Sequence, residues 1–270
     1  MSAVLPAEPT WIVGCGNMAG AMVAGWRVAG VDLSRAVVIR PSGTPVEGVR
    51  TVRTFGEAGL LPGLVLLGFK PQQLDEVASG LALRVTGQTT IVSILAGVEG
   101  ASLRARFPNA SAIVRAMPNL PVAVCRGIVP LFSEDADQAN RDLLGGLFRA
   151  LGMAIWCATI EAFSATGGVS GPGPAYVARF IAALADAGTA RGLDPELALT
   201  VARETVFGSA WLAASTSEAM DEIVARVRSP NGTTQAGLEV LDAELPALID
   251  RTLTAASRRS AELAAAARGD

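Results

Sequence analysis

The chain has 270 residues, of which 50% are hydrophobic and 17% charged, and its formal net charge is −3. These values fit a well-buried globular protein of one large domain or two ordinary ones, and they exclude an intrinsically disordered chain. They also provide no broad basic surface for nucleic acid. No apolar run reaches the ~18 residues that a membrane helix needs, so we expect no membrane span.

The absence of histidine narrows the possible chemistry most. It removes the commonest general acid–base and the commonest metal ligand, and with them the usual Ser-His-Asp and Cys-His catalysis. Three cysteines, Cys15, Cys125 and Cys157, show no metal-ligand spacing. We expect no metal site, and we expect reduced thiols in a cytoplasmic protein. Residues 1–9 lack the features of a signal peptide, so we interpret them as a loose tail.

Short apolar runs alternate with helix-like segments through residues 10–162. The runs are TWIVG (10–14), AVVIR (36–40), LVLLGF (64–69), TTIVSI (89–94), AIVRAM (112–117), GIVPLF (127–132) and AIWC (154–157). Continuous rather than alternating hydrophobicity is typical of parallel strands buried on both faces. With helices at Met18–Ala29 and Pro71–Leu83, the pattern predicts an α/β, Rossmann-like, doubly wound sheet.

Residues 163–270 differ in composition and pattern, because they are rich in alanine and contain no strand-like runs. Tyr176, Phe180, Ala183, Leu184 and Ala187 follow helical spacing, which predicts an all-α domain. Its helices carry more apolar surface than a small bundle can bury, which favours a partner chain over buried alanine-rich helices. We therefore predict a Rossmann-like domain at 1–162 and a helical domain at 163–270.

A glycine-rich turn joins the first strand to the first helix. Gly14, Gly16 and either Ala19 or Gly20 match the G-x-G-x-x-A/G pattern, in which glycines let a pyrophosphate approach the start of a helix. The alternative is a tight turn without a ligand. The next strand is followed by Arg40 and Ser42, where an NAD site has an acidic residue. Arg40 can pair with a 2′-phosphate, which favours NADPH; a solvated loop arginine is the alternative.

Six motifs together resemble those of pyrroline-5-carboxylate reductase. They are VGCGNMAGAM, LLGFKPQ, VSILAGV, VRAMPNLP, SGPGPAYV and SPNGTTQAGLEVL, in the family's order from Trp11 to the final helix. The resemblance implies a Rossmann-like NAD(P)H domain and a helical domain that dimerises and binds substrate, in a homodimer that can assemble further. It also implies hydride transfer from NADPH, with NADH possible, to the C=N carbon of 1-pyrroline-5-carboxylate. This oxidoreductase reaction gives L-proline and completes proline biosynthesis.

Such an activity fits a chain without histidine, because a protonated imine already carries the proton that polarises it. The enzyme then has mainly to position donor and acceptor and to exclude water. The alternatives are a related reductase of another cyclic imine or a 2-hydroxy acid, and a catalytically silent NADP-binding relative. Lys70 is the only lysine, so the chain lacks the second-domain lysine of the 2-hydroxy-acid dehydrogenases.

The resemblance also assigns residues to the cofactor. Lys70 lies in a segment that runs beside the ribose and nicotinamide in similar enzymes; a salt bridge between domains is the alternative. Pro71 is expected to help end the preceding strand. The predicted cofactor-binding residues are Gly14, Gly16, Asn17, Met18, Arg40, Ser42, Phe69, Lys70, Pro71, Ala96, Met117 and Asn119.

The loop RSPNGTT (228–234) is the predicted substrate site, because exposed N–H groups at a helix start can bind a carboxylate. The resemblance assigns the carboxylate to Ser229, Gly232 and Thr233 and the ring nitrogen to Thr234; helix capping by threonine is the alternative. It places Ser170, Gly173 and Tyr176 near the substrate or the subunit interface, with core packing the alternative for Tyr176. Three positions depart from the family pattern: Asn231, Gly63 and Phe55.

Overall fold

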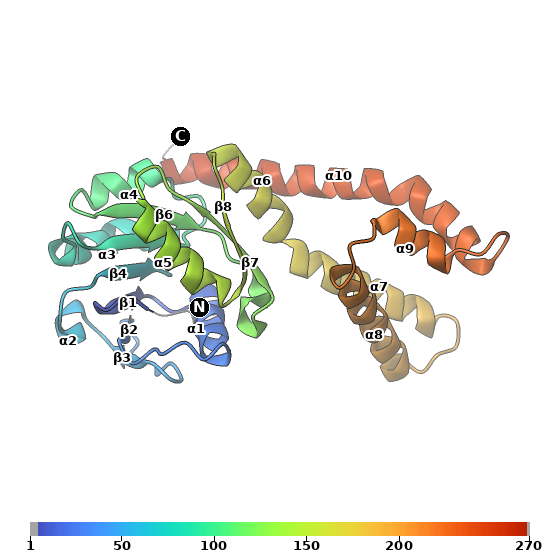
Figure 1. The fold of residues 1–270 in the computed structure, drawn as a ribbon, viewed down its shortest axis with the longest axis horizontal. Helices are drawn as coiled ribbons and strands as arrows, with labels where there is room; N and C mark the ends of the chain where they lie inside the picture. Colours follow the sequence, from blue (N-terminus) through green and yellow to red (C-terminus); the bar gives the residue numbers. More distant parts are fainter. Residues whose placement is uncertain (1–4, 269–270) are drawn as a thin grey trace. The chain divides into compact units, whose positions relative to one another are not determined.

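The structure, a computed structural model, describes residues 5–268 and contains two compact units (Figure 1). One unit holds the chain up to Pro172 together with the segment from Ser257, and the other holds Gly173–Ala256. The predicted boundary between residues 162 and 163 lies inside a helix, α6 (Ile160–Ser170), that belongs to the first unit. The first unit thus contains residues on both sides of the predicted boundary, as well as the segment from Ser257.

A single eight-stranded sheet forms the centre of the first unit, with strand order β3-β2-β1-β4-β5-β6-β7-β8. The strands are β1 (Thr10–Val13), β2 (Ala36–Ile39), β3 (Arg50–Val52), β4 (Leu64–Leu67), β5 (Thr90–Ser93), β6 (Ala112–Ala116), β7 (Gly127–Phe132) and β8 (Gly152–Trp156). All seven predicted strands are present. The eighth, β3, is a short edge strand whose residues run from exposed to buried, so it lacks the continuous apolar pattern.

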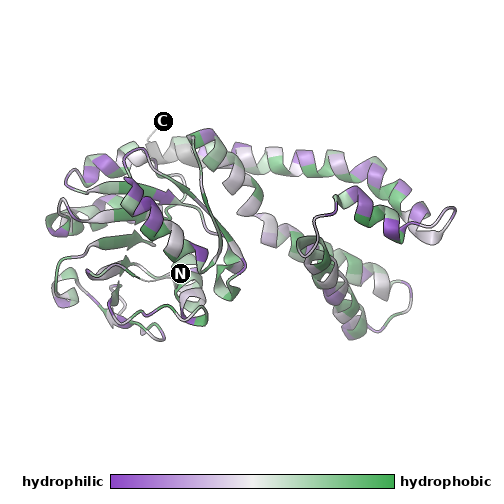
Figure 2. Cartoon of the chain, in the orientation of Figure 1, coloured by the Kyte–Doolittle hydropathy of each residue, from purple (hydrophilic) through white to green (hydrophobic). Residues whose placement is uncertain are grey.

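Both faces of the sheet are covered, as the apolar strands predicted. Successive residues of β1 enter different cores: Ile12 packs in one cluster, and Trp11 and Val13 pack in another. Figure 2 shows these strands as mainly hydrophobic. The helices and 3-10 turns of this unit are α1 (Asn17–Val28), α2 (Phe55–Ala58), η1 (Pro71–Gln73), α3 (Leu74–Leu81), η2 (Ala82–Arg84), α4 (Gly100–Arg106), η3 (Leu120–Val124), α5 (Gln138–Arg149) and α6.

The sheet is not wholly parallel, which corrects the sequence-based expectation. Strand β7 runs antiparallel to β6, and β8 is parallel to β7. The connection from β6 to β7 is the 3-10 turn η3 followed by Cys125, whose φ of 57° is left-handed. A parallel neighbour needs a crossover of a dozen or more residues, usually a helix, so this tight connection reverses the chain.

The described part of the predicted N-terminal tail, residues 5–9, packs against the first unit. Leu5 is buried in its core, and Pro9 accepts a hydrogen bond from the Gly63 amide (3.0 Å). Arg35 donates to the Ala7 carbonyl. The expectation of a loose tail is therefore wrong for residues 5–9, because an apolar side chain and backbone pairing hold them; residues 1–4 lie outside the described residues.

The second unit is entirely helical, as predicted. It contains α7 (Gly173–Thr189), α8 (Pro195–Ala214), α9 (Met220–Val227) and most of α10 (Thr233–Arg268). Its buried apolar core within the described residues consists of Ala185, Ala198 and Ala202. Large apolar side chains remain exposed on the same helices, among them Phe207 at 63% and Trp211 at 53%. The unit therefore leaves most of its large apolar surface uncovered.

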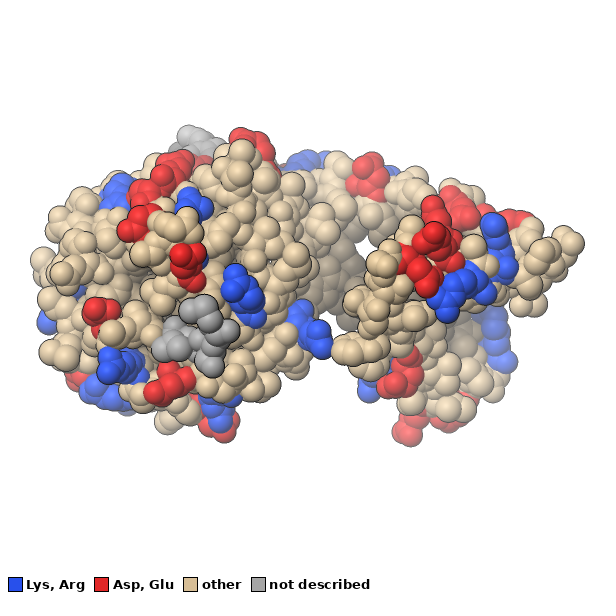
Figure 3. Space-filling view, in the orientation of Figure 1, with Lys and Arg blue, Asp and Glu red and all other residues tan. Residues whose placement is uncertain are grey.

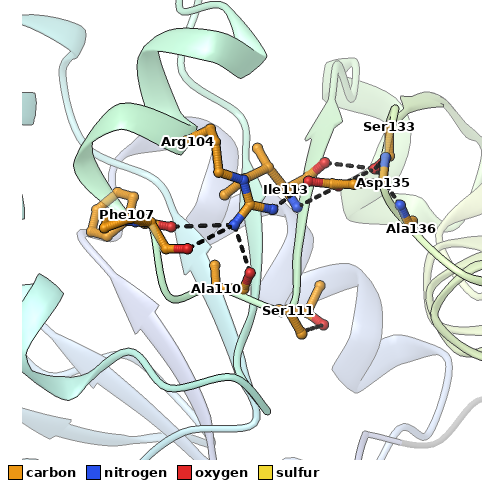
Figure 4. A network of polar contacts seen from close by, with 10 residues as sticks. Arg104, Phe107, Ala110, Ser111, Ile113, Ser133, Asp135 and Ala136 are labelled. Atoms are coloured by element: carbon orange, nitrogen blue, oxygen red, sulfur yellow. Dashed lines mark hydrogen bonds and ion pairs between the residues drawn. The ribbon is translucent and has the colours of Figure 1, made fainter.

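A polar network fastens the antiparallel β6–β7 junction (Figure 4). The Asp135 carboxylate accepts hydrogen bonds from the Ile113 amide (2.9 Å) and the Ser133 hydroxyl (3.0 Å), and it pairs with Arg104. Arg104 also donates to the Ala110 carbonyl (2.6 Å). Burial acts to raise the pKa of Asp135, but the Ile113 amide, Arg104 and Ser133 outweigh it and hold the pKa below its ordinary value.

We predict that Asp135→Ala lowers the free energy of unfolding by about 1–2 kcal/mol, since the Ile113 amide loses its acceptor. The Ser133 hydroxyl keeps the Ile113 carbonyl as an acceptor (2.7 Å). The Arg104 pair adds little, because 38% of the Asp135 side chain is exposed and solvent screens it. A carboxylate whose pKa is lowered by folding stabilises the folded protein at pH values above its unfolded pKa, which is about 3.9. This stabilisation is lost as the pH falls through the lower pKa of the folded state. Denaturant unfolding at pH 7 and at pH 3 measures both effects.

The matched control is Glu134→Ala, which removes an exposed neighbouring carboxylate. An equal loss of stability in both variants at pH 7, or a difference between wild type and Asp135→Ala that grows in acid, contradicts the assigned role of the Asp135 network.

Candidate active site

Three adjacent parallel strands end together at one edge of the sheet. Val13 of β1 pairs in register with Ile39 of β2 on one side and with Leu67 of β4 on the other. The residues that follow these three strands therefore lie at the carboxyl edge, where open α/β sheets bind their ligands. The glycine turn, Arg40 and the Gly68–Lys70 segment all meet this description.

Gly14 is required by the backbone itself. Its φ is +76°, and an added Cβ would lie 2.8 Å from the Gly68 carbonyl oxygen and 2.9 Å from the Phe69 Cβ. On the other side, a Cβ at Gly68 would lie 2.8 Å from the Cβ of Ala19, which is buried. Ala19 is thus the small residue that lets α1 approach the sheet. The side-chain position of Gly20 is almost open, with one atom at 4.0 Å.

Gly16 is different, because no neighbouring protein atom requires a glycine at this position. Its φ of −80° suits any residue, it is exposed, and an added Cβ would meet nothing within 4 Å. It is the N-cap of α1, and no side chain caps this end and no acidic residue lies in the first turn. Free amides and open space at a helix start fit a pyrophosphate, with exposed Asn17 and half-buried Met18 as its neighbours.

Arg40 and Ser42 lie in the loop after β2. The Gly43 amide donates to the Arg40 carbonyl (2.9 Å), and the Thr44 amide and hydroxyl donate to Ser42 Oγ (3.3 and 3.0 Å). Burial raises the pKa of the Cys15 thiol, and the charge of Arg40 acts to lower it. The Arg40 guanidinium is therefore close enough to the glycine turn to act on Cys15 electrostatically, which suits a group that binds the adenosine end of a cofactor.

Lys70 lies just beyond the end of β4. Strand β4 ends at Leu67, so Pro71 does not end it, contrary to expectation. Pro71 instead begins the 3-10 turn η1 and keeps Lys70 extended (φ −76°, ψ 136°). The Lys70 side chain is exposed and forms no ion pair within the described part of the chain. Phe69 is half-buried against the core, beside Gly14.

Three other predicted cofactor-binding residues are Met117 and Asn119, which follow β6, and the exposed Ala96, which follows β5. Asn119 is buried, and its carboxamide donates to the Ser170 carbonyl (3.0 Å) and accepts from the Ile128 amide (2.8 Å). The Met117 sulfur lies where a Cβ at Gly167 would come within 2.1 Å. Both side chains therefore tie the loop after β6 to neighbouring elements of its own unit, and their contact with the cofactor stays a prediction.

The 228–234 loop reverses the chain before α10. Asn231 has a φ of 56°, and its amide donates to Gln235 Oε1 (3.0 Å). This explains the departure from the family pattern, because asparagine tolerates the left-handed region better than other non-glycine residues. Gln235 was not predicted from the sequence. A glutamine three residues after the N-cap, here Gly232, is nevertheless a known signal of a helix N-terminus.

Gly232 brings Ser229 to the start of this helix. The Gly232 amide donates to the Ser229 carbonyl (3.0 Å), and an added Cβ at Gly232 would lie 2.2 Å from Ser229 Oγ. Thr233 and Thr234 open α10, as predicted. Neither hydroxyl forms a hydrogen bond within residues 5–268, so no bond supports the helix-capping alternative. The first amides of α10 also lack partners within the helix.

The other two departures serve packing. Phe55 stacks on buried Trp11 with ring centroids 6.0 Å apart and an interplanar angle of 11°. A Cβ at Gly63 would lie 2.6 Å from the Cβ of Glu8, so glycine lets residues 5–9 cross at this point. Ser170, predicted near the substrate or interface, donates to the Thr166 carbonyl (2.8 Å). Gly173 begins α7, and Tyr176 is half-buried in its first turns.

The described residues contain no group of three or more histidine, cysteine or acidic side chains that can hold a metal ion. None of their helices combines the length and apolar character needed to cross a membrane. Acidic and basic side chains are interspersed on the face of the first unit that Figure 3 shows. The surface seen there therefore has no single-sign field of the kind that attracts nucleic acid.

The doubly wound sheet and its glycine turn define a dinucleotide-dependent oxidoreductase with a helical second unit. Residues 161–263 match the family model for pyrroline-5-carboxylate reductase dimerisation. Pyrroline-5-carboxylate reductase of Pseudomonas aeruginosa is 36% identical over 263 residues, covering 93% of this chain and 95% of that protein. The chain belongs to the pyrroline-5-carboxylate reductase family.

Solved structures agree with this assignment. The enzyme of Coxiella burnetii matches with a TM-score of 0.87 and 32% identity, over 96% of this chain and 99% of that one. The Plasmodium falciparum enzyme, solved with NADP bound, has a TM-score of 0.82 at 22% identity, over 97% and 98% of the two chains. The second likeness bears on the fold alone.

We predict that Gly16→Ala and Gly14→Ala fail in different ways. Gly16→Ala should change the free energy of unfolding by less than about 1 kcal/mol but weaken NADPH binding at least about tenfold, because its methyl group occupies the pyrophosphate space. Gly14→Ala should destabilise the fold, because its Cβ meets the Gly68 backbone at a positive φ. Thermal melts and calorimetric titration with NADPH separate the two effects.

The control is Gly20→Ala, which places a methyl group in nearly open space on α1 and should preserve binding. Unchanged NADPH affinity in Gly16→Ala contradicts the pyrophosphate site.

Proposed function

We propose that the protein transfers a hydride from NADPH to the C=N carbon of 1-pyrroline-5-carboxylate and so forms L-proline, completing proline biosynthesis. The observation that supports it best is Gly16, which neither its backbone conformation nor a neighbouring protein atom requires, at the bare start of α1. Membership of the pyrroline-5-carboxylate reductase family supplies the substrate class.

The chemistry requires few proton transfers from the protein. When bound, NADPH supplies the hydride. A protonated cyclic imine already bears the positive charge that draws the hydride to carbon, so a chain without histidine is not at a disadvantage. The residues of the protein have to bind the two reactants, fix their orientation and exclude water.

We assign the cofactor to the carboxyl edge of the sheet. The amides at the start of α1 bind the pyrophosphate, and Gly16 leaves it room. Arg40 and Ser42 bind the 2′-phosphate, which gives the preference for NADPH over NADH. Lys70, extended and exposed beside Phe69 and without an ion pair in the described chain, extends toward the ribose.

We assign the substrate carboxylate to the start of α10. The amide of Thr233 and the hydroxyl of Ser229, which lies over Gly232, are the donors for it. Thr234 is the next residue along the helix, and its hydroxyl makes no bond within residues 5–268. A ring whose carboxylate is held by these donors has its nitrogen within reach of Thr234. A hydrogen bond there keeps the C=N carbon in a fixed orientation.

The protein acts as a homodimer through its helical part. The dimerisation model covers residues 161–263, and these helices expose large apolar side chains. A second copy is the partner that covers them. We further propose a cytoplasmic location, because the three cysteines are free thiols.

We predict that Thr234→Ala lowers kcat/KM with 1-pyrroline-5-carboxylate by roughly 10- to 150-fold. This is the change in kcat/KM expected when a hydrogen bond to a charged group is lost. NADPH affinity should stay unchanged, because the cofactor residues belong to the other unit. Thr234→Ser should keep much of the activity, since it keeps the hydroxyl. Steady-state NADPH oxidation with proline detection, together with thermal melts, measures these effects.

The result that contradicts the role of Thr234 is near-normal turnover in a Thr234→Ala protein of reduced stability, as expected for a helix cap. If the wild type itself does not reduce 1-pyrroline-5-carboxylate but still binds NADPH, the substrate assignment is wrong. Another cyclic imine is then the next substrate to assay.

We also predict that Phe207→Glu weakens the dimer. Phe207 is an exposed aromatic residue of α8 whose ring lies 6.5 Å from that of Trp211, and a carboxylate on a buried interface costs several kcal/mol. Analytical ultracentrifugation should show a lighter species with reduced activity. Leu83→Glu, at an 84% exposed position of the first unit, is the matched control. A Phe207→Glu protein that keeps the wild-type mass, or a fully active wild-type monomer, contradicts this interface.

A further inference from the structure

Two arginines follow two adjacent strands at the same edge of the sheet. Ile39 of β2 pairs in register with Val52 of β3, and the Arg40 amide donates to the Val52 carbonyl (3.0 Å). Arg40 and Arg53 are therefore the next residues on neighbouring parallel strands. Side chains at matching positions of such strands project to the same face, so the two arginine side chains begin on the same face at this edge of the sheet.

These two charges have no acidic partner in the described part of the chain. Neither guanidinium forms an ion pair or a hydrogen bond there. The nearby Glu57 carboxylate instead accepts from the Arg53 amide (3.3 Å) and the Thr54 hydroxyl (3.0 Å). Like charges at neighbouring positions destabilise a sheet edge, unless an anion lies between them.

The loop between the strands holds Arg53 in place. Gly43 has a φ of +64°, and an added Cβ would lie 2.5 Å from Arg53 Nε and 3.3 Å from Cζ. The guanidinium of Arg53 therefore packs directly on the turn that contains Ser42. Because Ser42 Oγ accepts both hydrogen bonds from Thr44, its own proton remains available to an anion.

We propose that Arg53 is a second specificity-determining residue for the cofactor, and that it binds the 2′-phosphate of NADPH together with Arg40 and Ser42. The inference rests on the proposed NADPH preference and adds to it a residue from a strand that carries no motif. A phosphate dianion neutralises both guanidinium groups through charge-assisted hydrogen bonds. The 2′-hydroxyl of NADH leaves the two cations facing each other.

Calorimetric titration of the protein with NADPH, NADH and 2′-AMP tests the inference without turnover. Arg53→Gln should weaken NADPH and 2′-AMP binding roughly 10- to 100-fold and leave NADH binding unchanged. Arg53→Lys should recover part of the loss, because it keeps the charge but not the planar fork. Arg84→Gln is the control with the same charge change and should bind NADPH as the wild type does. Arg84 is the last residue of η2, which leads to the start of β5 and not to the carboxyl edge of the sheet.

Thermal stability without ligand gives a second measurement. Removing one of two unpaired like charges should leave the melting temperature of Arg53→Gln unchanged or raise it, whereas a structural role for Arg53 lowers it. If Arg40→Gln abolishes the NADPH preference and Arg53→Gln keeps it, the inference about Arg53 is wrong and the 2′-phosphate site at Arg40 stands. If the wild type binds NADH as tightly as NADPH, the proposed cofactor preference itself fails.

Discussion

The close approach of two backbone segments, Gly14 after β1 and Gly68 after β4, governs the geometry of the cofactor end. A side chain at either position would collide, Gly14 with the Gly68 carbonyl and Gly68 with Ala19 of α1. Because both are glycines, the turn can close tightly and α1 can begin directly at the carboxyl edge of the sheet. The start of α1 then presents free amides at Gly16, and the neighbouring strand end presents Arg40. The proposed cofactor site thus follows from how these backbone segments pack against one another.

A second constraint comes from the helical unit, which cannot bury its own apolar surface. Its internal core within the described residues is three alanines, while aromatic residues such as Phe207 stay exposed. Small side chains let α7 and α8 pack closely but leave little apolar area inside. Most of the stabilising area must then come from a second copy, which agrees with the dimerisation model that covers residues 161–263. Folding of the helical unit and assembly of the dimer are therefore coupled.

Much of this architecture could be predicted from sequence, and the exceptions have physical causes. Buried strands were predicted because both of their faces are apolar, whereas β3 was missed because an edge strand buries only part of its surface. The reversal at β7 depends on the tight turn at Cys125, which local hydrophobicity does not encode. The glycine turn was recognised, but only packing separates Ala19 from Gly20 as the close-contact residue. Arg53 carries no motif, and its relation to Arg40 follows only from strand pairing.

The proposed reaction passes a hydride from the cofactor to the C=N carbon of a cyclic imino acid. The most direct test is to incubate the protein with NADPH deuterated at the transferable position and 1-pyrroline-5-carboxylate, and to locate the label in the product by NMR. We expect one deuterium per L-proline, on the ring carbon that adjoins nitrogen and does not bear the carboxylate. Proline without deuterium, or oxidation of NADPH without formation of proline, would contradict it.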